Sequence, residues 1–355
     1  MTRRKLRVVY PAYAIDTYNW ERITQVLQPI SEVCKLTVYH FNTDPSPQAD
    51  WCNIAPVPKY SNLFNIYQTT RDAMNIAMAL PDFDVLYCWS GGAYFQLLSV
   101  LTAEIVKKPV VMHINGDAHL SRTHHLNPTE KLLQDAADRL TLNNVNLIVP
   151  ISSVLREAVL PRVKNKNAVT EPVPFTVDTN DFTMQHYPKE ITIGYGGRVS
   201  PEKGFPFYVN VMEQAKNMRF RVAGPVQMKV QFPDNCHYDG VLSMEWMPRF
   251  YALNSAIALP SYGEGIPGMI LEAYACGRPV LVTPESLPSC IPCFGWKIPH
   301  DMEKWKAAIE GLTQAEIEEK GAAAREWITH NWLTWEDFAI KMKQYFTQAV
   351  NHDNK

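Results

Sequence analysis

The sequence predicts an α/β protein with two doubly wound parallel sheets. Short apolar runs rich in β-branched residues alternate with stretches of helical periodicity, which is typical of parallel strands covered by helices on both faces. The alternation forms two series of about six strands each along 355 residues. A chain of this length suits two domains of roughly 150–200 residues.

The first series of strands is expected at Leu6–Tyr10, Leu36–Phe41, Asp84–Trp89, Pro109–Ile114, Leu147–Ile151 and Ala168–Phe175. Its helices are expected at Ile66–Leu80, Ala93–Val106 and Leu132–Leu142. The second series is expected at Ile191–Tyr195, Arg219–Ala223, Cys236–Asp239, Ile257–Pro260, Pro279–Thr283 and Trp296–Pro299. Its helices are expected at Phe205–Asn217, Met269–Cys276 and Met302–Leu312.

A polar, proline-containing join near Met184–Glu190 separates the two series. We therefore expect a first domain over residues 1–184 and a second over residues 185–334. The tail, residues 335–355, carries apolar residues at helical spacing and must bury that face. Ligands bind such sheets at the carboxyl ends of the strands, so a cleft between the two domains is the expected site.

Composition excludes several classes of protein. Lys+Arg 34 against Asp+Glu 36 gives a net charge of -2, which disfavours a nucleic-acid partner. No apolar run approaches the roughly 20 residues that span a bilayer. Seven scattered cysteines indicate reduced thiols in a cytoplasmic protein, and the Cys290–Cys293 spacing alone lacks the second ligand pair of a zinc site. Peripheral contact with the inner face of a membrane stays open.

Two stretches carry candidate chemistry. In the first, a strand ends in Gly196–Gly197, and the following loop presents Arg198 and Lys203 before Gly204 opens a helix. Glycines let a ligand approach the backbone, and an Arg fork with a Lys point charge suits a pyrophosphate. The alternative is a glycine-rich turn with two solvated cations.

In the second stretch, a strand leads through Glu264 to a helix that begins near Pro267–Gly268. The unpaired N–H groups and the positive dipole end of that helix favour an anion. Glu264 precedes the helix and Glu272 lies on it, so each carboxylate can accept hydrogen bonds from sugar hydroxyls. The alternative is a capping Glu264 and a solvated Glu272.

Together the two stretches resemble the retaining glycosyltransferases of the GT-B type called family 4. The matching motifs are Gly197-Arg198…Lys203-Gly204 and Glu264…Glu272-Ala-Tyr-Ala-Cys-Gly-Arg-Pro-Val280. The resemblance implies a GT-B fold, in which two Rossmann-like domains face a cleft and a C-terminal helix returns to the first domain. It also implies transfer of a sugar from a nucleotide sugar, with retention of anomeric configuration. We expect no further cofactor and no metal, because no Asp-x-Asp pair stands at the end of a strand: Asp82-x-Asp84 precedes its strand.

The resemblance carries roles over to matching positions. Arg198 and Lys203 would hold the diphosphate, Glu264 the donor sugar, and Glu272 the ribose. His113 resembles the first-domain histidine that faces the donor sugar, although a buried structural histidine fits equally well. The remaining substrate-binding candidates are Gly197, Gly265, Ile266, Pro267 and Gly268 around the donor, with Asp117, Tyr13 and Asp16 in the first domain.

The chain departs from the family in its first strand–helix loop, residues 10–18, which lacks the usual glycines. That loop helps to form the acceptor side, so the acceptor (a glycan, a lipid-linked sugar or a small molecule) stays open. Three rival functions remain. They are a glycosidase with paired carboxylates, a phosphorylase of the same fold, and a non-catalytic protein that binds nucleotide sugars.

Overall fold

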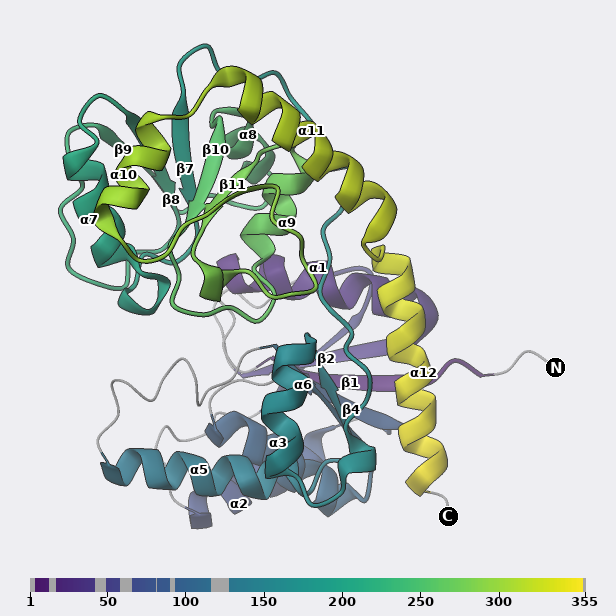
Figure 1. Ribbon diagram of the computed structural model, residues 1–355. Helices are drawn as coiled ribbons and strands as arrows, with labels where there is room; N and C mark the ends of the chain where they lie inside the picture. Colours follow the sequence, from purple (N-terminus) through teal and green to yellow (C-terminus); the bar gives the residue numbers. More distant parts are fainter. Residues whose placement is uncertain are drawn as a thin grey trace. The chain divides into compact units, whose positions relative to one another are not determined.

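The computed structural model describes residues 4–12, 17–41, 49–57, 66–80, 82–89, 93–115 and 128–353. Backbone contacts divide the chain into two compact units (Figure 1). Unit 1 combines Met1–Pro174 with Trp335–Lys355, and unit 2 is Phe175–Thr334. Each unit is an α/β body around one parallel sheet.

The sheet of unit 1 has six parallel strands in the order β3-β2-β1-β4-β5-β6. The strands are β1 (Arg7–Ala12), β2 (Lys35–Phe41), β3 (Asn53–Val57), β4 (Val85–Trp89), β5 (Val110–Ile114) and β6 (Leu147–Pro150). Strands β4, β5 and β6 are almost completely buried. This burial explains their continuous apolar sequences, because helices cover both faces of such a sheet.

The helices of unit 1 are α1 (Thr17–Val33), α2 (Ile66–Ala79), α3 (Ala93–Val106), α5 (Pro128–Leu142), α6 (Ser153–Val159) and α12 (Trp335–Asp353). Helix α12, drawn in yellow in Figure 1, packs against α1 and against strands β4 and β5. It buries Phe338, Met342 and Phe346 completely. The apolar face expected in the tail therefore belongs to the core of unit 1.

Two strands of unit 1 differ from the sequence prediction. Ala168–Phe175 is not a strand: beside β6 it forms one isolated bridge, between Val169 and Ile148. Thr170 N–H donates to the Ile148 carbonyl, and Val173 N–H donates to the Pro150 carbonyl. Pro172 and Pro174 lack the N–H groups that a continuous ladder requires. The sheet nevertheless has six strands, because β3, a short segment that the sequence does not predict as a strand, lies at the opposite edge from β6.

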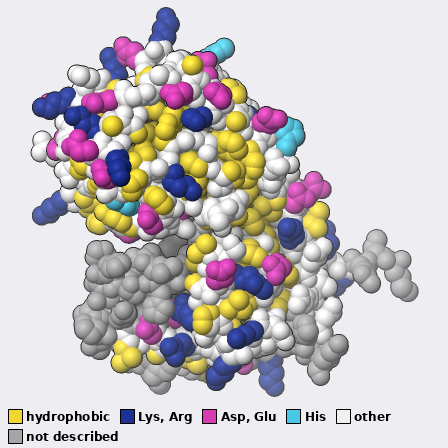
Figure 2. Space-filling model, viewed as in Figure 1, with side chains coloured by type: hydrophobic (Ala, Val, Ile, Leu, Met, Phe, Trp, Pro, Cys, Tyr) yellow, Lys and Arg dark blue, Asp and Glu magenta, His cyan; other side chains and the backbone are white. Residues whose placement is uncertain are grey.

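The sheet of unit 2 has six parallel strands in the order β12-β11-β10-β7-β8-β9. They are β7 (Thr192–Gly196), β8 (Arg219–Ala223), β9 (Cys236–Gly240), β10 (Ala256–Leu259), β11 (Val280–Val282) and β12 (Gly295–Lys297). The helices are α7 (Phe205–Gln214), α8 (Met247–Ala252), α9 (Gly268–Ala275), α10 (Met302–Glu310) and α11 (Gln314–Asn331). All six predicted strands of this half are present. Figure 2 shows acidic and basic side chains interspersed over the visible face of unit 2.

Unit 2 begins at Phe175, ten residues before the predicted boundary, and two arginines tie residues 179–186 to the end of α9. Arg278 is completely buried, and it donates to the carbonyls of Gln185, His186, Cys276, Tyr251 and Ala252. Arg325 on α11 donates to the carbonyls of Thr179, Phe182 and Ala275. Both cations therefore lie where α9 ends, next to the carbonyl groups that carry the negative end of its dipole.

Candidate active site in unit 2

Strands β7 and β10 are neighbours in the sheet of unit 2, although their sequences are about 60 residues apart. The chain continues from β7 toward one edge of the sheet and from β10 toward the other. Such a reversal of strand order opens a crevice at the carboxyl ends of the two strands. Both stretches that the sequence analysis singled out begin at this point.

Lys203 and Glu264 meet above this crevice. The Lys203 Nζ atom lies 2.6 Å from Glu264 Oε1 and 2.7 Å from Oε2. The two side chains are 21% and 10% exposed, so the ion pair is partly shielded from water. The structure thus pairs two residues to which the resemblance assigns separate roles, the diphosphate for Lys203 and the donor sugar for Glu264.

Gly204 allows the two loops to approach each other. Its φ is +69°, and a Cβ atom there would lie 1.8 Å from the carbonyl oxygen of Pro260. A larger residue would therefore push the 200–204 turn away from the 260–264 loop. Contacts of Glu202 join the same loops, because its carbonyl accepts from Ser261 Oγ and from Tyr262 N–H, each at 3.4 Å.

Arg198 lies on the same loop as Lys203 and is more exposed. The hydroxyl of Tyr195 donates to the Arg198 carbonyl at 2.6 Å and fixes the backbone of the loop. The guanidinium contacts Glu202 at 3.3 Å and Gln227 at 3.4 Å. Burial raises the pKa of Glu202, but its own backbone N–H and the charges of Arg198 and Lys203 outweigh burial and hold that pKa below its usual range. Glu202 therefore stays ionised beside both cations.

Helix α9 begins directly behind these loops, with Pro267 as its N-cap residue. Its first N–H groups have no acceptor within the helix. Pro267 is buried, whereas Gly265, Ile266 and Gly268 are half-buried. The amide of Gly196 donates to Met269 Sδ at 2.9 Å, which ties the first turn of α9 to the end of β7.

Glu272 lies one turn further along α9 and is 5% exposed. The hydroxyl of Tyr251, on α8, donates to Glu272 Oε2 at 2.7 Å. The same hydroxyl lies 3.5 Å from where a Cβ atom of Gly196 would stand, so the pair is next to the end of β7. Tyr251 was not identified from the sequence, because its only signal there is an apolar pair with Phe250.

His113 lies in the core of unit 1 and is completely buried. Its Nε2–H donates to the Val173 carbonyl at 2.8 Å, so Nδ1 accepts from the Tyr87 hydroxyl at 2.9 Å. Phe338 of α12 stacks on the ring, and burial lowers the pKa of His113 to about 4. This arrangement fits the buried structural histidine of the sequence analysis, and the role of a residue that faces the donor sugar stays a prediction. Tyr13, Asp16 and Asp117 lie outside the described residues.

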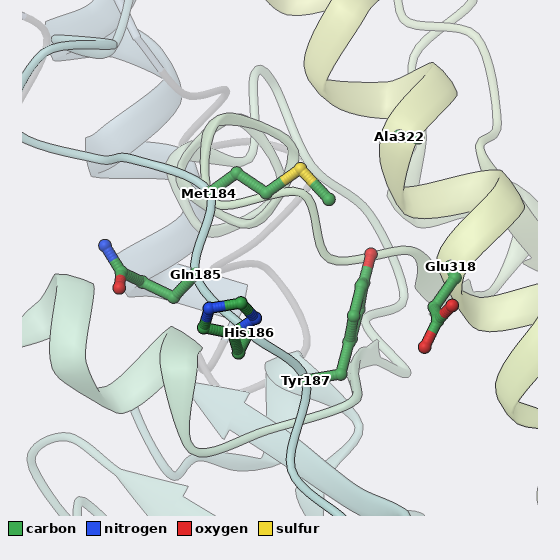
Figure 3. A pocket seen from close by; sticks show the side chains of 6 residues that line it. All are labelled: Met184, Gln185, His186, Tyr187, Glu318 and Ala322. Carbon is green, nitrogen blue, oxygen red and sulfur yellow. The ribbon is translucent and has the colours of Figure 1, made fainter.

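A pocket of about 630 Å³ lies where residues 184–187 pass α11. Figure 3 shows Tyr187 and Glu318 on one side of it and Gln185 and His186 on the other. None of the predicted site residues is among the described residues that line it. In the described part of the chain, no group of three or more His, Cys, Asp or Glu residues could hold a metal, and no helix is long and apolar enough to cross a membrane.

Comparisons with known proteins concern the family and the fold of the chain. Residues 190–315 match the family described as "Glycosyl transferases group 1". The alpha-galactosylglucosyldiacylglycerol synthase of Streptococcus pneumoniae is 28% identical over 132 residues, which are 34% of this chain and 35% of that protein. The chain spans about a third of the length of the curated relatives that it matches.

Solved structures match nearly the whole chain. Sucrose-phosphate synthase from Thermosynechococcus elongatus has a TM-score of 0.78 at 15% identity, covering 98% of this chain and 100% of that one. Anabaena HepE, in complex with UDP and glucose, has a TM-score of 0.72 at 12% identity, covering 98% and 99%. These similarities identify the fold as GT-B. Residues 190–315 are in addition similar to the group 1 glycosyl transferases.

Proposed function

We propose that this chain, a GT-B protein whose residues 190–315 are similar to the group 1 glycosyl transferases, transfers a sugar from a nucleotide diphosphate sugar to an acceptor and retains the anomeric configuration. One observation carries the proposal. Lys203, Glu264 and the first turn of α9 converge at the crevice between β7 and β10, with Glu272 on the same helix.

The reaction breaks the bond between the anomeric carbon and a phosphate oxygen, and it forms a bond from that carbon to an acceptor oxygen. Negative charge develops on the departing diphosphate. Lys203, Arg198 and the N–H groups at the start of α9 are positioned to stabilise that charge. Glu264 would accept hydroxyls of the transferred sugar and Glu272 those of the ribose.

The same groups support a reaction that needs no metal. Two cationic side chains and a helix terminus can neutralise a diphosphate without a bound ion. We expect transfer to continue unchanged in EDTA. Loss of activity in EDTA that Mg²⁺ or Mn²⁺ restores would refute this part of the proposal.

A nucleotide sugar as donor is supported by HepE, whose structure contains UDP and glucose in the same fold. A cytoplasmic location is supported by the cysteines, since all seven are free thiols. Contact with a membrane surface would depend on the acceptor, and an acceptor screen should include lipid-linked sugars.

The test is a screen of UDP-, GDP- and ADP-linked sugars for release of free nucleotide in the presence of a panel of acceptors. Proton NMR of the first product then gives its anomeric configuration. We expect one donor class to turn over with retention. Turnover that requires inorganic phosphate would favour a phosphorylase, and binding of a nucleotide sugar without turnover would favour a binding protein.

A further inference from the structure

Two side chains hold the loop that carries Glu264 from outside the donor motifs. Thr283, which follows β11, donates its hydroxyl to the Ser261 carbonyl at 2.5 Å. The other is His300, which lies between β12 and α10. The His300 Nε2–H donates to the Pro260 carbonyl at 2.8 Å. This carbonyl is the oxygen that Gly204 approaches so closely, and His300 Nε2 lies 3.5 Å from where a Cβ atom of Gly204 would stand. His300 therefore contacts the point at which the two loops meet.

The imidazole makes a second contact with the same loop. Its ring stacks on Tyr262, with 4.2 Å between the ring centroids and 12° between the planes. Tyr262 is 58% exposed, so little else surrounds its ring. The imidazole also packs edge-to-face with Phe207, which lies in the first turn of α7. The two ring centroids are 5.2 Å apart. Phe207 thus supports the imidazole, and the imidazole supports the loop.

We propose that His300 is a positioning residue of the donor site: it fixes residues 260–262 and thereby places the Glu264 carboxylate for the transferred sugar. This inference rests on the proposed function. Glu264 follows Tyr262 by two residues, so a loose Tyr262 ring and an unbonded Pro260 carbonyl shift the backbone that carries the carboxylate. Glu272 is held separately, by Tyr251 within α8 and α9.

A positioning role for His300 affects the contact with the sugar but not the contact with the ribose, whereas a general loss of stability would affect both. Removing the imidazole should impair sugar placement and leave the ribose contact intact. His300→Ala should therefore lower kcat/KM about 10- to 100-fold, because a hydrogen bond and a ring stack are both lost. The affinity for free nucleoside diphosphate should change less than about threefold.

Two further variants divide the contacts. His300→Gln keeps an N–H donor for the Pro260 carbonyl and loses the stack, whereas His300→Phe keeps the stack and loses the donor. Each should recover part of the activity. The control is His330→Ala, since His330 is exposed on α11 and its Nδ1–H donates to the Glu326 carbonyl of the same helix.

The decisive measurement is the ratio of kcat/KM for two donors that share a nucleotide and differ in one sugar hydroxyl. We expect His300→Ala to bring that ratio toward one and His330→Ala to leave it unchanged. An unchanged ratio with wild-type kcat/KM in a folded His300→Ala protein would overturn the inference. If the wild-type chain turned over no nucleotide sugar, the proposed function itself would fail.

A second readout is independent of activity. The acetylation rate of Lys203, measured by mass spectrometry, reports whether its ion pair with Glu264 persists. In His300→Ala we expect this rate to rise several-fold relative to Lys229, an exposed lysine of the same unit. Equal Lys203 rates in the wild type and the variant would show that His300 does not position the loop.

Discussion

The Lys203 Nζ atom lies within 2.7 Å of both carboxylate oxygens of Glu264. The Glu264 carboxylate is therefore paired with the same ammonium group, that of Lys203, that we assign to the diphosphate of the donor. An incoming diphosphate must share Lys203 with Glu264 or displace it. Glu264 therefore competes with a free nucleotide for Lys203, in addition to its proposed contact with the donor sugar.

Glu264→Gln should bind free UDP or GDP more tightly than the wild type, by about 3- to 10-fold, because one negative charge near the diphosphate is removed. The same variant should lose sugar transfer. Calorimetry with the free nucleotide measures the first effect and nucleotide release the second. Weaker nucleotide binding in a folded Glu264→Gln protein would contradict the prediction.

Lys203→Ala should lose turnover by about 10²–10³-fold, since it removes a cation from the developing charge of the leaving diphosphate. The variant should still fold, with a modest loss of stability, because Lys203 is only half-buried and its removal leaves the Glu264 carboxylate without its cation. Initial rates and thermal melts check both statements. Lys229→Ala is the matched control, and a Lys203→Ala enzyme with wild-type kcat would refute the phosphate assignment.

Glu272→Ala should weaken binding of UDP by about 1–3 kcal/mol, because a buried ribose hydroxyl loses its acceptor. Tyr251→Phe should weaken it less, since the carboxylate stays and only its orienting hydroxyl is removed. Inorganic pyrophosphate has no ribose, so neither variant should change its affinity. Parallel calorimetry with the two ligands checks the assignment, and equal losses for both ligands would exclude a specific ribose contact.

Arg278→Lys should destabilise unit 2 by about 2–4 kcal/mol, although it conserves the charge. A lysine ammonium cannot reach all the carbonyls that the buried guanidinium satisfies. Urea unfolding followed by tryptophan fluorescence measures the change. Arg249→Lys, at an exposed position on α8, should stay within about 0.5 kcal/mol of the wild type.

His113 should make unit 1 less stable in mild acid. Its pKa falls from 6.5 to about 4 on folding, so between these values the unfolded chain binds a proton that the folded chain does not. Stability is therefore complete above pH 6.5 and falls as the pH drops toward 4, by on the order of 3 kcal/mol in all. Melting temperatures from pH 7 to pH 5 should fall less steeply in His113→Phe than in the wild type.

In unit 2 the strands β10 and β11 were the most readily predicted, because they are continuous apolar runs with Pro260 and Pro279 next to them. Prediction failed where local signals conflict. Helix α1 contains Pro29, and β3 is a five-residue segment with a proline. At the site, the motifs identified Lys203 and Glu264 separately, but their pairing depends on β7 lying beside β10. Tyr251 and His300 follow from the same tertiary arrangement, and no local pattern marks them.

The division of the chain also has a consequence for its synthesis. Unit 2 is one uninterrupted segment, whereas unit 1 needs both ends of the sequence. When a ribosome has completed unit 2, unit 1 still lacks α12, and the surfaces of α1, β4 and β5 that this helix covers are open. Phe338, Met342 and Phe346 fill that gap only when α12 emerges. Unit 1 is therefore completed after unit 2, although most of unit 1 is translated earlier.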